Sequence, residues 1–382
     1  MLEELGAPIP GTLTAPASSA EATVATIPDS ELDAIILKPE LSLHPQRLLV
    51  DARQSPVVAE LACKLEEAVT ELIGAQWRPF VFPAGKHRGE GYRFFGDPTE
   101  TLLTLAQACP YLSPALQEQV RQHVSKLSEP GGPLAGPTGS ATLDPRKGEV
   151  RSPYDVPDEK LWGINNDIIR TPLARLYPIW LWAYVTGDFG HPRRHWQAIR
   201  ELVDQQPNPW NEDCRNGYVA GLIADCRLAK HVQDEEAFAR GLAPTRRAIR
   251  ERLIFELAHP ARGVLTEVPT GRHIFSRRRY LTPEVALLCA RYAPDSQRKL
   301  MERYVDYHRS TWWLAWNVEL AWRNESPYAL PTMSQEIFAA KAMIIREPAQ
   351  KLRKWLDIPW CKADLLYIQK LGWCIKRYLQ SD

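Results

Sequence analysis

The sequence predicts an all-α protein, an α/α barrel (toroid) of about twelve helices with an irregular N-terminal arm. Apolar residues recur at helical spacing from residue 56 onward, no convincing run of strands interrupts them, and apolar helices alternate with amphipathic ones. An amphipathic helix can face water on one side, whereas an apolar helix needs cover on most sides. The alternation therefore indicates an outer layer of amphipathic helices around an inner layer of apolar ones.

The chain of 382 residues divides into an arm over residues 1–52 and a toroid domain over residues 53–382. The arm is rich in Pro, Ala, Ser and Thr and shows little periodicity, which is typical of a loosely ordered terminus. An open helical solenoid is the alternative architecture for the domain, but no repeat of fixed period supports it.

Caps and apolar stripes predict where the helices begin and end. Asp97-Pro98 and Ser113-Pro114 each combine a capping side chain with a proline suited to the first helical turn. Little of the apolar helix that begins near Asp167 can face water, and Gly187 is expected to end it. Helices are expected over residues 56–73, 97–109, from 113 onward, and over 167–186, 191–204, 217–231, 234–258, 282–292, 295–309, 333–346, 347–356 and 361–380.

The connections between these helices are long in four places. Residues 77–98, 205–217 and 259–281 are rich in helix breakers, aromatic residues or basic residues, and residues 129–160 form the longest such segment. A loop of that length inside a compact protein is usually functional, so we expect residues 129–160 to form a flap over one end of the barrel. Within the helix over 217–231, small residues would let a neighbouring helix approach closely; they are Gly217, Ala220, Gly221 and Ala224.

Composition excludes several classes of function. The net charge of +1 gives no general attraction to nucleic acid or to an anionic membrane, and no stretch of about 18 apolar residues predicts a membrane span. No signal peptide is visible at the N-terminus. The chain is thus expected to be cytoplasmic if it is complete, and exported if a signal peptide was removed.

No metal or other cofactor is expected. The seven cysteines lack zinc spacing, and most lie in apolar helical patterns, which indicates reduced and buried thiols. His191 and His195 are four residues apart, but their helix is polar and no third ligand is evident, so we expect surface histidines. An isoprenoid cyclase would need an aspartate-rich motif such as DDxxD, which the sequence does not contain.

The segments LYPIWLWAYVTGDFGHPRRHWQAI and NGYVAGLIADCRLAK resemble the helical pairs of α/α-toroid carbohydrate-active enzymes. That group includes many polysaccharide lyases and the six-hairpin glycosidases. The resemblance extends over about residues 56–380, and it implies a saccharide-binding cleft built by inter-helix loops at one end of the barrel.

The resemblance implies, first, a polysaccharide lyase that cleaves a uronic-acid glycan by β-elimination. Toroid lyases use Asn to neutralise the substrate carboxylate, and His and Tyr to move the protons. Amide donors before an apolar helix suit a carboxylate, and arginines beside a tyrosine lower the pKa of its phenol. Where the alginate-lyase-like pattern has a His after the two asparagines, this chain has Asp167. The expected catalytic residues are Tyr280, His273 and Asp167, and the expected substrate-binding residues are Asn165, Asn166, Arg170, Arg277, Arg279, Trp162, Trp312 and Trp316.

Two other functions stay open. A glycoside hydrolase needs two carboxylates about 5–10 Å apart, and the candidates are Asp167, Glu212, Asp213, Glu267, Glu325 and Glu336. A non-catalytic helical binding or scaffold protein would need no such pair. In that case Asn165 and Asp167 would serve as helix caps, and Trp312 and Trp316 would pack between helices.

Overall fold

The computed structural model describes residues 17–37, 56–74, 98–138, 172–205 and 215–258, with residues 292, 367–369, 371–372, 375 and 379. These residues are helical apart from turns, and no strand occurs among them, which confirms the predicted all-α class. The helices expected over 295–309, 333–346 and 347–356 lie outside the described residues. No helix within the described ranges is both long and apolar enough to cross a membrane.

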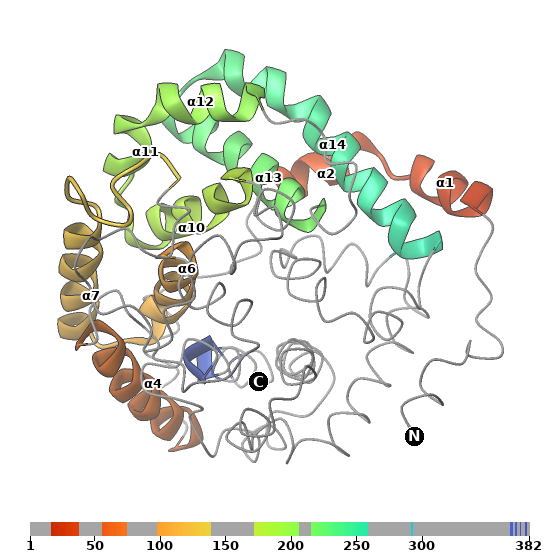
Figure 1. The fold of residues 1–382 in the computed structure, drawn as a ribbon. Helices are drawn as coiled ribbons and strands as arrows, with labels where there is room; N and C mark the ends of the chain where they lie inside the picture. The colour runs from red at the N-terminus through yellow and green to blue at the C-terminus, as the bar shows by residue number, and fades with distance from the viewer. Residues whose placement is uncertain are drawn as a thin grey trace, which may run out of the picture.

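The described helices form two layers that follow a common arc (Figure 1). The outer layer contains α4 (Pro56–Gly74), α7 (Pro114–Leu127), α12 (Trp196–Gln205) and α14 (Glu235–Ala258). The inner layer contains α6 (Pro98–Ala108), α10 (Leu176–Thr186) and α13 (Arg215–Val232). Within the inner layer α10 contacts both α6 and α13. Contacts such as those of α13 with α14 join the inner layer to the outer one. The predicted alternation of inner and outer helices therefore holds over this part of the chain.

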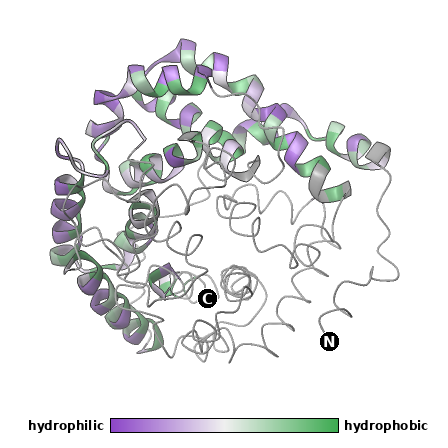
Figure 2. Cartoon of the chain, in the orientation of Figure 1, coloured by the Kyte–Doolittle hydropathy of each residue, from purple (hydrophilic) through white to green (hydrophobic). Residues whose placement is uncertain are grey.

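Hydropathy accounts for the two layers. Figure 2 shows the outer helices α4 and α7 with hydrophobic residues toward the inner layer and hydrophilic residues away from it. The inner helix α10 is apolar on all sides and is buried from Leu176 through Ala183. Of the helix predicted over 167–186, the structure describes residues 172–186, which are 3₁₀ over 172–175 and α-helical from Leu176 onward. Among these residues the prediction that the helix hardly faces water fails in the last turn, where Tyr184 is 37% exposed.

The predicted residues Ser113 and Gly187 lie at helix ends as expected, but the start of α7 is bound by a residue of another helix. Ser113 precedes α7, but its side chain makes no capping bond. Instead its backbone N–H donates to the Glu66 carboxylate of α4 at 2.6 Å, which ties two neighbouring outer helices together. Gly187 ends α10 in the left-handed conformation (φ 74°), as predicted.

The contact between α13 and the 3₁₀ helix η2 (Pro172–Arg175) depends on a glycine. A Cβ added at Gly221 would lie 2.4 Å from the carbonyl oxygen of Leu173 and 2.5 Å from its Cγ. Only a residue without a side chain permits this approach of the two backbones. The prediction that small residues in this helix allow close packing is confirmed at Gly221.

The described residues near the C-terminus pack on α6, the first of the described inner helices. Gln369 Nε2 donates to Thr104 Oγ1 of α6 at 2.8 Å, and both side chains are buried. Ile368, Leu371 and Ile375 are fully buried and belong to the same core cluster as α6 and α10. Segments more than 260 residues apart in the chain are thus packed together.

Residues 17–37 correct the prediction of an irregular arm, because they form α1 (Ala17–Ala25) and α2 (Asp29–Leu37). The rest of the predicted arm lies outside the described residues. Nine-residue helices are marginal on their own, so packing against other helices must order them. That packing is supplied by α13 and α14, which the sequence gives no means of foreseeing.

Two smaller predictions also need correction. The helix expected over 191–204 is broken at His195 into α11 (Gly190–Arg194) and α12. Among the cysteines that the structure describes, Cys109 and Cys226 are buried as predicted, whereas Cys63 is exposed on α4.

We expect Gly221→Ala to destabilise the protein by about 1–3 kcal/mol, because the new methyl group would meet the Leu173 backbone. The matched control is Gly74→Ala at the end of α4, where an added Cβ meets nothing within 4 Å. Urea unfolding followed by tryptophan fluorescence measures both variants. Equal stability of the two variants would contradict the close contact of α13 with η2.

Candidate functional site

Every site residue predicted from the sequence lies outside the described residues. These are Trp162, Asn165, Asn166, Asp167, Arg170, His273, Arg277, Arg279, Tyr280, Trp312 and Trp316, and the same holds for Glu212, Asp213, Glu267, Glu325 and Glu336. For these residues the structure gives only the positions of the helices that precede or follow them in the chain.

Those helices are connected according to one rule. The chain leaves a described inner helix through a short turn. Three residues, 187–189, separate α10 from the short helix α11, which leads into α12, and two residues, 233–234, separate α13 from α14. The turn after α6 is likewise short and contains η1 (Cys109–Tyr111). Helices joined by such short turns are antiparallel neighbours.

The long connections run the other way, from an outer helix to the start of an inner one. Residues 75–97 lead from α4 into α6, residues 128–171 from α7 into η2 and α10, and residues 206–214 from α12 into α13. Asn165, Asn166, Asp167 and Arg170 thus belong to a connection that enters an inner helix at its N-terminus.

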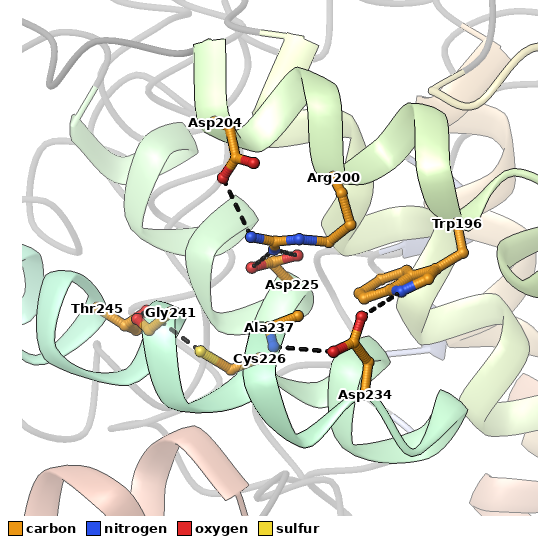
Figure 3. Close-up of polar contacts among 9 residues, drawn as sticks. All are labelled: Trp196, Arg200, Asp204, Asp225, Cys226, Asp234, Ala237, Gly241 and Thr245. Carbon is orange, nitrogen blue, oxygen red and sulfur yellow. Dashed lines mark hydrogen bonds and ion pairs between the residues drawn. The ribbon is translucent and has the colours of Figure 1, made fainter.

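The described residues themselves contain a buried polar cluster between α12, α13 and α14 (Figure 3). Arg200 Nη1 donates to both carboxylate oxygens of Asp225 at 2.7 Å, and Nη2 donates to Asp204 at 3.2 Å. Arg200 is 6% exposed and Asp225 is fully buried. Burial acts to lower the pKa of Arg200, but the charge and hydrogen bonds of Asp225, together with the charges of Asp204 and Asp234, outweigh burial and raise that pKa, so the arginine stays charged.

The same cluster fixes the start of α14. Asp234 accepts the indole N–H of Trp196 at 2.9 Å and the backbone N–H of Ala237 at 2.9 Å. The Ala237 bond, followed by the Trp196 bond, lowers the pKa of Asp234. Asp234 therefore caps α14 while it holds α12 beside it.

Cys226 lies next to Asp225 but has no reactive thiol. Its Sγ lies 3.3 Å from Thr245 Oγ1, and that hydroxyl donates to the Gly241 carbonyl at 2.7 Å, so the thiol donates to Thr245. Burial raises the pKa of Cys226 to about 12, which keeps the thiol protonated. A Cβ at Gly241 would lie 3.2 Å from this sulfur, so the glycine leaves room for it.

This cluster joins three helices and does not resemble a reaction centre, because its two buried charges, Arg200 and Asp225, satisfy one another. Sequence reasoning missed it. The signal was available in the helix over 217–231, where Asp225 and Arg227 interrupt an otherwise apolar pattern. Charged residues at such positions are paired when they are buried.

His191 corrects the prediction of a surface histidine. Both of its ring nitrogens are shielded from solvent, and its ring lies 4.6 Å from that of His195. Burial, and next the neighbouring His195, lower the pKa of His191 to about 4. Among the described residues, no group of three His, Cys, Asp or Glu side chains lies close enough together to hold a metal ion, and this applies to the two histidines.

Comparison with known proteins gives no match, whether with protein-family models, with curated proteins or with solved structures.

Asp225→Asn is expected to destabilise the protein by about 3–5 kcal/mol, because it leaves the buried Arg200 without its main counter-charge. Asp204→Asn is the matched control: this carboxylate binds the same guanidinium but is 56% exposed, so its loss should cost less than about 1 kcal/mol. Urea unfolding separates the two. Similar losses would contradict the dominant role assigned to Asp225.

The stability of the protein should fall with acid through His191. The unfolded chain takes up this proton near pH 6.5 and the folded chain only near pH 4, so the stabilisation is complete above pH 6.5 and is lost as pH falls toward 4. His191→Gln should reduce the loss of unfolding free energy between pH 7 and pH 5 by roughly 1–2 kcal/mol. An unchanged pH dependence in this variant would show that the ring is not buried in its neutral form.

Proposed function

We propose that the domain is an α/α toroid in which the arc of two layers closes on itself. Two observations support this proposal. The inner and outer helices alternate in chain order from α4 to α14, and the C-terminal residues pack on α6 through the Gln369–Thr104 bond. A closed ring of helical pairs brings its last segment back to its first, whereas an open solenoid keeps the two apart.

We propose further that the toroid is a carbohydrate-active enzyme, a polysaccharide lyase that cleaves a uronic-acid glycan by β-elimination. The observation that carries this proposal is the connection rule. The long connections enter inner helices at their N-termini, and the connection before η2 carries Asn165, Asn166 and Arg170. The chain after the outer helix α14 carries His273 and Tyr280, and from the same alternation we expect it to lead into a further inner helix.

Antiparallel pairs put every connection of this kind at one end of a closed ring. Residues from two of these connections would therefore lie at the same end of the ring, where they could form one site. The predicted residue types also complement one another, since amides and arginines bind an anion while a tyrosine and a histidine transfer protons.

In the proposed reaction the amides of Asn165 and Asn166 donate to the uronate carboxylate and make the C5 proton more acidic. Tyr280, its pKa lowered by neighbouring arginines such as Arg279, removes that proton. The C5–H electron pair forms the C4–C5 double bond, the C4–O bond breaks, and the leaving oxygen takes a proton from His273. Trp162, Trp312 and Trp316 offer flat faces for the sugar rings.

Absorbance near 235 nm tests this proposal, because the unsaturated product of β-elimination absorbs there. We expect the absorbance to rise with at least one polysaccharide in a panel of uronic-acid glycans. Tyr280→Phe and His273→Ala should each lower the rate by at least about 100-fold, in line with the contribution of general acid–base groups.

Tyr184→Phe and His231→Ala are the matched controls. Tyr184 lies in the last turn of α10, and His231 lies in the last turn of α13, so both are at the opposite ends of inner helices from the proposed site. Both variants should keep the activity. New reducing ends without absorbance would contradict elimination and indicate a hydrolase that uses Asp167 and a second carboxylate.

A further inference from the structure

The helices α1 and α2, residues 17–37, are held to the rest of the protein by arginines; we call this segment the strap. Arg246 of α14 binds both carboxylate oxygens of Asp33, at 2.6 Å from Nε and 2.5 Å from Nη2, and its Nη1 donates to Asp29 at 3.0 Å. Arg250, one turn later, donates to the Asp29 carboxylate at 2.6 Å and to the Ile27 carbonyl at 3.0 Å. Asp29 is the only strap residue that two arginines of α14 share among these contacts.

The end of the strap is bound by an arginine from the inner layer. Arg227 of α13 donates to the carbonyl oxygens of Ile36 at 2.7 Å and Ile35 at 2.9 Å. A cation suits this position because carbonyls at the C-terminus of a helix carry partial negative charge. The Arg227 guanidinium also lies 4.2 Å from the ring of Trp180, which connects the strap to α10.

A tyrosine and several apolar contacts complete the docking, and the Tyr292 hydroxyl donates to the Glu31 carboxylate of α2. Val24, Ile27, Leu32 and Ile36 are at most 2% exposed and belong to the main core cluster. These side chains would be exposed to water if the strap left its site, so apolar burial also holds the strap in place. The surface of α13 and α14 that receives it is both apolar and basic, which suits an acidic amphipathic segment.

Several features make the order of the strap dependent on its contacts with the rest of the protein. Each helix has nine residues, too few to persist without packing. The strap is joined to α4 through residues 38–55 but packs on helices about 190 to 220 residues further along the chain. Its ion pairs are partly open to solvent, with Asp29 54% exposed, Arg250 29% and Arg246 22%, so dissolved salt screens them.

We propose that residues 17–37 form an electrostatically latched strap, which undocks and unfolds as one unit while the described inner helices stay folded. Ionic strength sets its docking equilibrium. Undocking uncovers a basic and apolar surface on α13 and α14 that fits an acidic helical segment. The strap is the segment of this chain that occupies that surface.

Hydrogen exchange measured by mass spectrometry on the full chain tests the proposal. Peptides from residues 17–37 should exchange at least about tenfold faster in about 1 M than in about 0.05 M sodium chloride, because several partly exposed ion pairs weaken together. Peptides from α6 and α10 should exchange at the same rate in both solutions.

Variants assign the effect to the arginines of α14. The double variant Arg246→Gln and Arg250→Gln should raise strap exchange at low salt and abolish most of the salt dependence. Arg240→Gln is the matched control on the same helix, because Arg240 pairs only at 3.8 Å with the exposed Glu236 of its own helix, among the contacts described. Combining Asp33→Arg with Arg246→Asp reverses the bidentate pair and should restore part of the slow exchange that either single change removes, since the bond from Arg246 to Asp29 stays lost.

Three results would overturn the proposal. The strap could exchange as slowly as α6 and α10 in both salt solutions. The double variant could leave the salt dependence unchanged. The double variant could also accelerate α6 and α10 as much as the strap, which would mean that residues 17–37 unfold only with the whole protein.

Discussion

Helix α13 is the constraint on which the described structure depends, because it packs on both layers and carries charges into the interior. It contacts α14, α10, η2 and α2. Asp225 on this helix is fully buried, and an unpaired carboxylate there would be strongly unfavourable. Arg200 must therefore reach it from α12, which sets the position of an outer helix relative to an inner one.

Other contacts follow once α13 is in place. Gly221 lets the backbone of η2 lie against the helix, and η2 runs directly into α10. Arg227, two residues after Asp225, projects to α2 and to Trp180. A single helix thus determines where its outer partner, its inner neighbour and the N-terminal segment lie. Small residues and charges, rather than large apolar ones, specify these positions.

The sequence predicts the helical class, the alternation of layers and many helix ends, because each depends on local periodicity and on caps such as Pro98, Pro114 and Gly187. It does not predict α1 and α2, whose order comes from distant arginines. It also misplaces His191, since burial depends on what packs over a short helix rather than on that helix alone. The pairing of Arg200 with Asp225 joins α12 to α13, and spacing along the chain cannot show which arginine meets which acid.

The residues predicted to form the saccharide site follow from resemblance and from their place in the connections, and they lie outside the described residues. The helices nonetheless limit where such a site can be. Asp167 and Arg170 precede an inner helix, whereas the Arg200–Asp225 pair is buried between α12 and α13. Any reaction of this chain must therefore use groups other than that pair.

The unequal lengths of the connections have an evolutionary consequence. The turns after α10 and α13 have only three and two residues, so an inserted residue there would change the angle between the paired helices. The connections into α6, α10 and α13 carry no such restriction, and lengthening a loop costs little conformational entropy. Substitutions, insertions and grafted segments can therefore accumulate at one end of the helices while the scaffold is inherited unchanged.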